Sequence, residues 1–181
     1  MNDAIENEAK ILNIGPEEIR GKLIRLGAQK VGEFNFRRHV FDAIPKREGR
    51  WLRLRTDGQR TTITAKEISH DDVDGTSEWE VEVSDFEDTL KILQKIGLES
   101  RGYQENRREL YKLNDVEISI DFWPRLKPYI EIEAKTPEQV YETARQLGFN
   151  AGQLTGKNTK KLYAESGIDL DKVAELNFDG L

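Results

Sequence analysis

Hydrophobic and polar residues alternate with a period of two along eight segments of the chain. Successive side chains of a β-strand point to opposite faces, so each alternation predicts a strand with one apolar and one polar face. Most of the glycines fall between these segments and mark turns. The predicted strands are residues 5–13, 34–42, 50–55, 61–66, 78–83, 103–111, 116–122 and 129–134.

Apolar residues at helical spacing predict helices between and after these strands. Pro16 and Pro137 suit the first turn of a helix, and Gly27 and Gly148 suit the position that follows its last turn. The Asp-Asp-Val-Asp-Gly sequence within residues 69–76 predicts an exposed, mobile loop. The predicted helices are residues 16–27, 85–96, 137–147 and 157–165, with a short one after Asp169.

The polar faces of the predicted strands are charged rather than merely polar. Carboxylates repeat in pairs on three strands, and Arg or Lys repeats on two others. The acids on these faces are Glu6, Glu8, Glu78, Glu80, Glu82, Glu117, Asp121, Glu131 and Glu133. The bases are Lys10, Arg53, Arg55, Lys66 and Arg108.

Two arrangements explain such strands. An antiparallel sheet can expose one charged face to water, or eight strands can close into a barrel with the charges inside. The repeated carboxylate pairs favour the barrel, because a solvated face usually mixes polar residues loosely. We therefore predict a single α+β domain over residues 1–181, an eight-stranded antiparallel β-barrel (a tunnel) with helices packed outside.

Composition removes several classes of function. The 181 residues include 34 acids and 28 bases, no Cys and two His, for a net charge of −6. This excludes thiolate sites and disfavours a multi-histidine zinc site, and the acidic balance argues against nucleic acid as a partner. The N-terminal sequence has no secretory pattern, and no apolar run approaches the ~18 residues of a spanning helix. We expect a cytoplasmic protein with no membrane partner.

Charges inside a barrel need partners, because buried charges are costly unless they are paired or bound to ions. Carboxylates without His or Cys favour Mg²⁺, Mn²⁺ or Ca²⁺. Arg and Lys suit phosphate oxygens. A divalent metal on carboxylates together with basic side chains is the equipment of polyphosphate chemistry, and the chain has no Walker-type loop to hold the phosphates by its backbone.

The sequence Glu6-Asn7-Glu8-Ala9-Lys10 resembles the Glu-x-Glu-x-Lys signature of the CYTH superfamily, also called the triphosphate tunnel metalloenzymes. This superfamily includes class IV adenylyl cyclases and thiamine triphosphatases. The resemblance extends over about residues 5–168. Further matches in the order of the family are Arg53-x-Arg55, Lys66, Glu80-x-Glu82, Arg108, Asp121 and Glu131-x-Glu133.

The resemblance implies an enzyme, a class IV-like adenylate cyclase or a triphosphatase, acting on ATP, thiamine triphosphate or tripolyphosphate with Mg²⁺ or Mn²⁺, and a homodimer is an option. The implied triphosphate-binding residues are Lys10, Arg53, Arg55, Lys66 and Arg108. The implied metal ligands are Glu6, Glu8, Glu80, Glu82, Asp121, Glu131 and Glu133, with the two terminal Glu-x-Glu pairs foremost. The implied catalytic residues are Lys10, Lys66, Arg108 and Asp121.

The chain departs from cyclase-type members in its sixth strand, where Asn106 stands in place of a Lys and removes a positive charge. Arg107 has the opposite strand parity and cannot simply replace it. Trp123, which precedes a proline, predicts a tunnel rim that differs in shape from that of cyclase-type members. Two alternatives therefore stay open: a catalytically impaired module that binds triphosphate or polyphosphate, and a structural domain with a solvated charged face.

Other side chains have two interpretations. His39 is either a general base or a strand histidine held in a hydrogen bond. Arg37 and Arg38 lie on opposite faces of one strand, so one of them can reach the tunnel. The basic residues of the last predicted helix could close over one mouth of the tunnel or form a solvated face; they are Lys157, Lys160 and Lys161.

Overall fold

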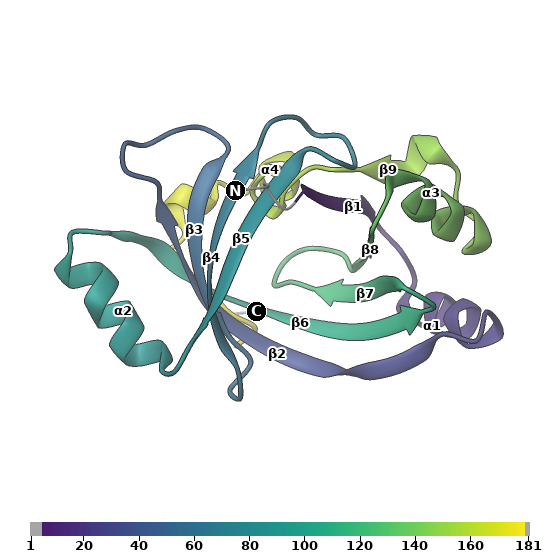
Figure 1. The fold of residues 1–181 in the computed structure, drawn as a ribbon, viewed down its shortest axis with the longest axis horizontal. Coiled ribbons are helices and arrows are strands. Elements are labelled where there is room, and N and C mark those ends of the chain that lie inside the picture. The colour runs from purple at the N-terminus through teal and green to yellow at the C-terminus, as the bar shows by residue number, and fades with distance from the viewer. Residues whose placement is uncertain (1–4, 180–181) are drawn as a thin grey trace.

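Eight strands close into an antiparallel barrel in the computed structural model, which describes residues 5–179 (Figure 1). The order around the ring is β6-β2-β3-β4-β5-β1-β8-β7, and pairing of β7 with β6 closes it. The strands are β1 (Ile5–Ile11), β2 (Gln29–Asp42), β3 (Arg50–Thr56), β4 (Thr61–Ile68), β5 (Thr76–Val83), β6 (Ser100–Leu113), β7 (Val116–Phe122) and β8 (Tyr129–Ala134). The predicted fold class is confirmed, and the open sheet is excluded.

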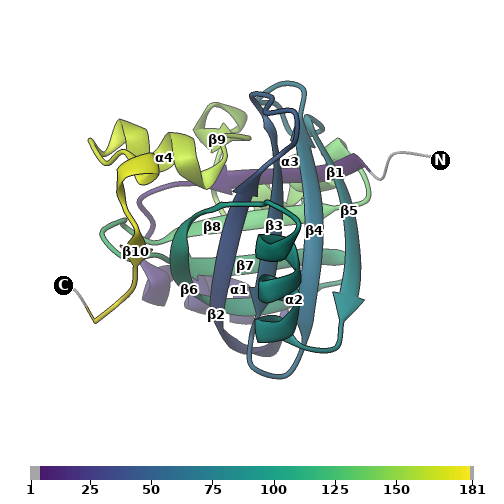
Figure 2. The same ribbon diagram turned by 90° about the vertical axis from the view of Figure 1, so that its left-hand side faces the viewer.

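Helices lie outside the barrel, as predicted. In Figure 1, α1 and α3 lie at one end of the molecule and α2 at the other. The helices are α1 (Pro16–Arg25), α2 (Phe86–Lys95), α3 (Pro137–Gln146) and α4 (Thr159–Glu165), with 3₁₀ turns η1 (Ala151–Gln153) and η2 (Leu170–Lys172). Two short strands are additional to the prediction: β9 (Leu154–Thr155), which pairs with β1, and β10 (Glu175–Leu176), which pairs in parallel with β6. Figure 2 shows α4 and β9 close together, at the upper left of the view.

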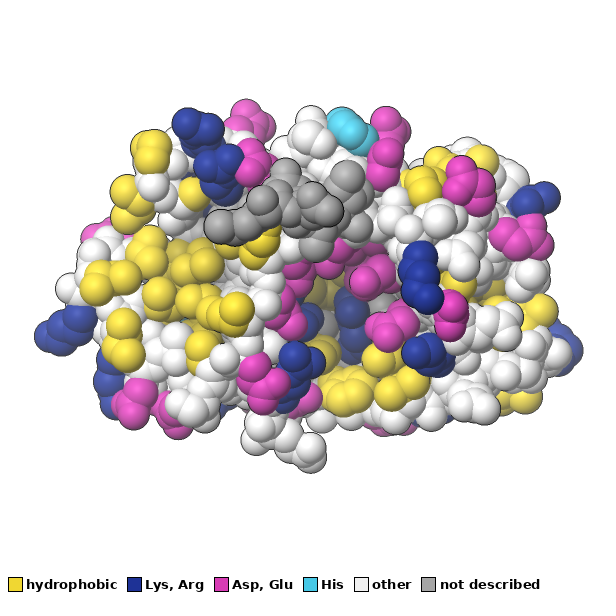
Figure 3. All heavy atoms as spheres, in the orientation of Figure 1, with side chains coloured by type: hydrophobic (Ala, Val, Ile, Leu, Met, Phe, Trp, Pro, Cys, Tyr) yellow, Lys and Arg dark blue, Asp and Glu magenta, His cyan; other side chains and the backbone are white. Residues whose placement is uncertain are grey.

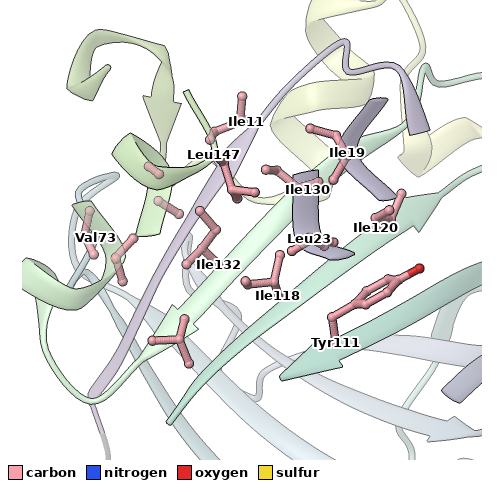
Figure 4. Close-up of a cluster of buried hydrophobic side chains, with 14 residues drawn as sticks. Ile11, Ile19, Leu23, Val73, Tyr111, Ile118, Ile120, Ile130, Ile132 and Leu147 are labelled. Atoms are coloured by element: carbon pink, nitrogen blue, oxygen red, sulfur yellow. The ribbon is translucent and has the colours of Figure 1, made fainter. Parts of the chain in front are cut away.

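The largest hydrophobic core lies between the outer faces of β1, β7 and β8 and the helices α1 and α3 (Figure 4). Ile118, Ile120, Ile130 and Ile132 are fully buried there, and each alternates with a polar residue on the inner face. Burying such a side chain stabilises the fold by roughly 1.5–3 kcal/mol. The apolar halves of the strand pattern therefore hold the helices, and the charged halves are left to line the inside.

The loop at residues 69–75 is largely exposed, as expected, but one of its residues anchors it to the barrel. The closure between β1 and β5 is short, with only two residue pairs in register. The loop fills the gap beside it: the backbone N–H of Glu8 donates to the carbonyl of Val73 at 2.9 Å, and the Val73 side chain is buried in the core. Gly156 also donates to the Asp71 carbonyl at 3.1 Å. The apolar anchor Val73 is what fixes this polar segment in place.

The outer face of β5 is apolar but is not covered by a helix. Trp79 is 39% exposed and Val81 is 60% exposed. Figure 3 shows hydrophobic side chains gathered over this part of the surface, on the left of the view. The reason is that α2 packs against β3 instead, where Phe86 and Leu93 cover Leu54.

Within residues 5–179, no helix has both the length and the hydrophobicity that crossing a membrane would require.

Candidate functional site

The inner faces of the barrel strands enclose a cavity of about 1090 Å³. Figure 3 shows it as a hollow in the middle of the molecule, with acidic and basic side chains at its walls. Its volume is at the upper end of the range of small-molecule sites, roughly 300–1,000 Å³. The sequence-predicted residues that line it are Glu6, Glu8, Lys10, Arg53, Arg55, Lys66, Glu78, Glu80, Arg108, Glu117, Glu131 and Glu133.

Two predicted residues share the inward parity but do not line the cavity. Glu82 lies at the exposed end of β5, where its carboxylate accepts a hydrogen bond from Arg60 at 2.8 Å. Asp121 is fully buried in the wall, where Arg108 donates to both of its oxygens at 2.9 and 2.8 Å and Ser119 donates at 2.8 Å. Its lone pairs are therefore largely committed within the protein.

Glu131 on β8 is the centre of one ion-pair network. Its two oxygens lie 2.9 Å from Lys10 Nζ and 2.8 Å from Arg108 Nη2, and Lys10 also lies 3.1 Å from Glu8. Burial alone would raise the pKa of Glu131, but Lys10 and Arg108 together hold it well below its ordinary value. Burial would lower the pKa of Lys10, but Glu131 and Glu8 raise it. Glu131 and Lys10 are therefore both charged at neutral pH.

A second network has too few cations for its acids. Lys66 on β4 pairs with Glu6 at 2.8 Å and also with Glu78. Burial raises the pKa of Glu6 to about 8, and the opposing effect of Lys66 is weaker because Glu78 shares this cation. The pKa of Glu78 is lowered, because Lys66 and Arg53 outweigh the effect of its burial. Lys66 is therefore shared by two carboxylates, of which Glu78 is also 3.5 Å from Arg53.

A row of three carboxylates crosses the neighbouring strands. Glu133 on β8 is in register with Glu8 on β1 and with Glu117 on β7. Within residues 5–179, no Lys or Arg is within ion-pair distance of Glu133, and burial beside Glu131 and Glu8 raises its pKa to about 7. Mutual repulsion of this kind is relieved by a bound cation.

These residues fit a divalent metal ion by their chemistry, since hard cations take oxygen ligands. In the part of the chain that the structure describes, no group of three or more Asp, Glu or His side chains already converges on a common point. Several of the carboxylates are turned toward Lys10 and Lys66 instead. The ligands that are least committed to ion pairs are Glu133 and Glu117, of which the sequence prediction of metal ligands included only the first.

Guanidinium groups gather on the β2–β3 side of the cavity, across the ring from β1 and β8. Arg53 lies 3.4 Å from Glu80 and 3.5 Å from Glu78, and Arg55 has only a 3.8 Å contact with Glu80. Burial beside other guanidinium groups lowers the pKa of Arg55 to about 9, so it stays charged at neutral pH. The nitrogen Nε of Arg53 is buried without a hydrogen-bond partner among the described residues. This wall therefore has more positive charge and more hydrogen-bond donors than the surrounding acids and acceptors pair with.

The adjacent arginines of the sequence separate as their parity predicts. Arg38 on β2 faces the cavity, and Arg37 faces outward and pairs with Glu87 at 2.9 Å. On β6, Asn106 lines the cavity and is buried, while Arg107 points outward and lies over the Phe178 ring. The position of Asn106 is therefore neutral, and Arg107 does not replace the missing charge.

The sequence prediction missed two aromatic residues of the cavity, Phe34 and Phe36, whereas Trp123, which it assigned to the rim, does line the cavity. Phe34 and Phe36 on β2 stack at 5.9 Å and line the cavity, and Arg55 lies over Phe36. Trp51 on β3 also lines the cavity. It is in register with Asp42 of β2, so it lies at the opposite end of the β2–β3 pairing from Phe36. The signal was present as parity, because Phe34, Phe36 and Arg38 are spaced by two.

The basic residues of α4 divide between two roles. Lys160 and Lys161 line one mouth of the cavity and pair with Asp171 and Asp71, at 2.6 and 2.5 Å. Lys157 pairs with Glu165 away from it. The mouth is therefore bordered by two ion pairs, one that ties α4 to η2 and one that ties it to the loop after β4.

His39 is not part of the cavity and is unsuited to act as a general base there. It lies on the outer face of β2, where Nδ1 is 2.8 Å from Ser100 Oγ and the ring packs against Phe86 and Tyr103. Burial lowers its pKa from the usual value of 6.5. The interpretation as a hydrogen-bonded strand histidine is the one that the geometry supports.

We expect His39 to make the fold less stable in acid. The unfolded chain takes up a proton near pH 6.5 and the folded chain only at lower pH, so the free energy of unfolding falls as the pH falls through this interval. Urea unfolding of the wild type and of His39→Gln at about pH 7.5 and about pH 5.5 measures the effect. The wild type should lose more stability than the variant, and equal losses would contradict the burial of a neutral His39. Other titrating groups are common to both proteins and cancel in the difference.

Comparison with known proteins places this geometry among relatives. The CYTH domain model matches residues 4–164. The PH1012 protein from Pyrococcus horikoshii has 26% sequence identity and a TM-score of 0.75, over 85% of this chain and 96% of that chain. No curated protein is similar enough in sequence to match.

Two more distant structures share the fold. An adenylate cyclase candidate from Vibrio parahaemolyticus has 13% identity and a TM-score of 0.76, over 90% of this chain and 99% of that chain. An adenylyl cyclase candidate from Hippeastrum, reported with a dominant triphosphatase activity, has 16% identity and a TM-score of 0.59, over 91% and 97% of the two chains. At these identities the likeness shows the fold alone.

Proposed function

The chain belongs to the CYTH domain family, and we propose that it binds a triphosphate in its tunnel and turns it over with a divalent metal ion. The observation that carries this proposal is the division of charge between opposite walls of one cavity. Guanidinium groups in excess lie on β2 and β3, and carboxylates in excess lie on β1, β7 and β8. A polyanion bound together with a cation satisfies both walls at once.

The basic residues supply the phosphate contacts in this proposal. Arg53 and Arg55 offer planar donor forks, which match phosphate oxygens in two-point contacts. Thr62 on β4 is in register with Arg55, and its buried hydroxyl has no partner among the described residues, like the Nε of Arg53. Lys10, Lys66 and Arg108 add positive charge from the other strands, each anchored by a carboxylate that fixes its position.

The acidic residues supply the metal ligands. The two Glu-x-Glu pairs would hold the ion, with Glu8 and Glu133 nearest in register and Glu6 and Glu131 beside them. Glu117 would add an oxygen next to Glu133. A bound Mg²⁺ or Mn²⁺ supplies neutralisation of the phosphate oxygens as charge develops during transfer. Glu82 and Asp121 are not included, because one lies outside the cavity and the other is fully engaged in the wall.

The chemical step needs an attacking hydroxyl and a group that accepts its proton. Water attacks the terminal phosphorus in hydrolysis, and the bond to the bridging oxygen breaks. The ribose 3′-hydroxyl attacks the α-phosphorus in cyclisation, and pyrophosphate leaves. In either reaction the carboxylates of the cavity are the available bases, and the basic wall holds the phosphates in line.

The decisive experiment is an assay of products from tripolyphosphate, ATP and thiamine triphosphate, with Mg²⁺, with Mn²⁺ and with a chelator. We expect metal-dependent conversion of at least one of them. Orthophosphate as the product marks a hydrolase, and cyclic AMP with pyrophosphate marks a cyclase. Binding without conversion under saturating metal would support the catalytically impaired module instead. No binding at all would contradict the proposal and favour a structural domain. A cytoplasmic location and a homodimer stay predictions.

A further inference from the structure

Arg38 is a cavity-facing cation without an acidic partner. Within residues 5–179, no carboxylate is within ion-pair distance of its guanidinium, whereas Lys10, Lys66, Arg53 and Arg108 each have at least one at 3.5 Å or less. Its Nε donates to the Gln104 side-chain oxygen at 3.1 Å, and its Cζ lies over the Trp123 ring, 4.2 Å from the ring centre. The side chain is thus held in place by neutral groups only.

The neighbours of Arg38 increase the cost of its charge. Arg38 is in register with Arg55 on β3, and Arg53 is two residues farther along the same strand. Burial and the charge of Arg53 lower the pKa of Arg38 to about 9, so it remains a cation at neutral pH. Breaking or omitting the partner of a buried charge is strongly unfavourable. The ligand-free protein therefore carries a cluster of three guanidinium groups with Glu78 and Glu80 as the nearest acids.

The orientation of Arg38 leaves one edge of its donor fork available. A guanidinium has five N–H donors, and the described residues take only the one on Nε. Gln104 holds that edge, and the guanidinium carbon lies over the Trp123 ring. The two terminal nitrogens remain, on a residue that lines the cavity. Such a held fork binds two oxygens of one phosphoryl group.

We propose that Arg38 and Arg55 together form a phosphoryl subsite, so that Arg38 is a further binding residue of the tunnel. This inference rests on the proposed function, because the phosphoryl group belongs to the triphosphate bound there. The ligand supplies the negative charge that the protein omits at this point. Asn106 on β6 is the neutral diagonal neighbour of Arg38. Arg38 is in register with Gln104, and Asn106 is two residues farther along β6, opposite Phe36. Arg38 therefore supplies from β2 a charge that β6 lacks.

The test measures tripolyphosphate binding by calorimetry in the presence of a chelator, so that metal ligands take no part. Arg38→Gln should weaken binding at least tenfold while the midpoint of thermal unfolding of the ligand-free protein stays equal or rises, because an unpaired buried charge has been removed. Arg37→Gln is the matched control, since Arg37 is the adjacent residue and faces outward. It should bind within twofold of the wild type.

A second variant guards against a loss of folding. Arg38→Gln with Asn106→Lys moves the charge to the diagonal neighbour, and it should regain at least threefold in affinity over Arg38→Gln. Binding by Arg38→Gln within twofold of the wild type would overturn the inference, as would a fall of several degrees in its ligand-free unfolding midpoint, which would mark a purely structural role. If the wild type binds tripolyphosphate neither in chelator nor with Mg²⁺, the proposed function fails rather than this assignment alone.

Discussion

Replacing Glu131 by glutamine is expected to reduce metal-dependent turnover of a triphosphate by about 100-fold or more, the effect of removing one preorganised electrostatic group. Glu131 lies between Lys10 and Arg108, at 2.9 and 2.8 Å, and is the only contact shared by these two cations within residues 5–179. The amide keeps the shape of the side chain but carries no charge, so both cations lose an anchor and the acidic wall loses one of the proposed metal ligands. Glu131→Ala should have at least as large an effect.

The control for this prediction is Glu109→Gln. Glu109 is also a buried, ion-paired glutamate, but it lies on the outer face of β6, where Arg20 and Tyr111 donate to it. Both variants remove one partner of an ion pair, which costs about 3–5 kcal/mol for a buried pair and less for Glu109, because its partner Arg20 is partly exposed. Only Glu131→Gln should lose turnover per folded molecule. Rates measured over a series of Mg²⁺ and Mn²⁺ concentrations decide the matter, and turnover within threefold of the wild type would contradict the role given to Glu131.

Strand parity carried most of what could be predicted from the sequence. The period of two is a local property, so residues such as Glu6, Glu8 and Lys10 could be placed on one face without knowledge of the fold. A closed ring then turns that face inward, and twelve of the fourteen residues predicted on it line the cavity. Parity says which face a side chain occupies, and the fold says what that face encloses.

Strand parity could not predict how far along its strand, and hence how deep in the barrel, a residue lies. Glu80 and Glu82 are equivalent by parity, yet Glu80 lines the cavity and Glu82 lies outside it at the end of β5. Asp121 is likewise equivalent to Glu117, but it is enclosed by Arg108 and Ser119. These differences depend on where neighbouring strands end, which is set by tertiary packing rather than by local sequence.

The part of β2 that faces the cavity was missed for a related reason. Its inward residues are Phe34, Phe36, Arg38 and Val40, so the inner face is mostly apolar and does not show the charge that marked the other strands. The charged residues on both faces, such as Arg37 and Arg38, left the choice of face open. Only the pairing of Arg38 with Arg55 settles it.

Tripolyphosphate with Mg²⁺ is expected to raise the midpoint of thermal unfolding by roughly 5–10 °C at about 100 times its dissociation constant. A ligand that binds only the folded state adds about 2.7 kcal/mol at that concentration, and each kcal/mol shifts the midpoint by about 2–4 °C for a chain of this size. The physical source is the pair of uncompensated walls: guanidinium groups at Arg38, Arg53 and Arg55, and carboxylates at Glu117 and Glu133. Within each wall, the like charges repel one another in the ligand-free barrel, and this repulsion is relieved when the ligand and the metal ion bind.

Two comparisons separate this stabilisation from a general salt effect. Sulfate at matched ionic strength should give a much smaller shift, because it spans only one phosphate position, and added NaCl should reduce the shift given by tripolyphosphate since screening weakens the attraction. Arg53→Gln should lose most of the shift, because Arg53 is buried in the basic wall and its Nε lacks a partner among the described residues. Arg145→Gln, on the exposed face of α3 where Arg145 pairs with Glu142, should keep the whole shift. An equal shift in Arg53→Gln would place the anion elsewhere on the protein, because a tunnel that binds through its basic wall cannot lose that guanidinium without losing affinity.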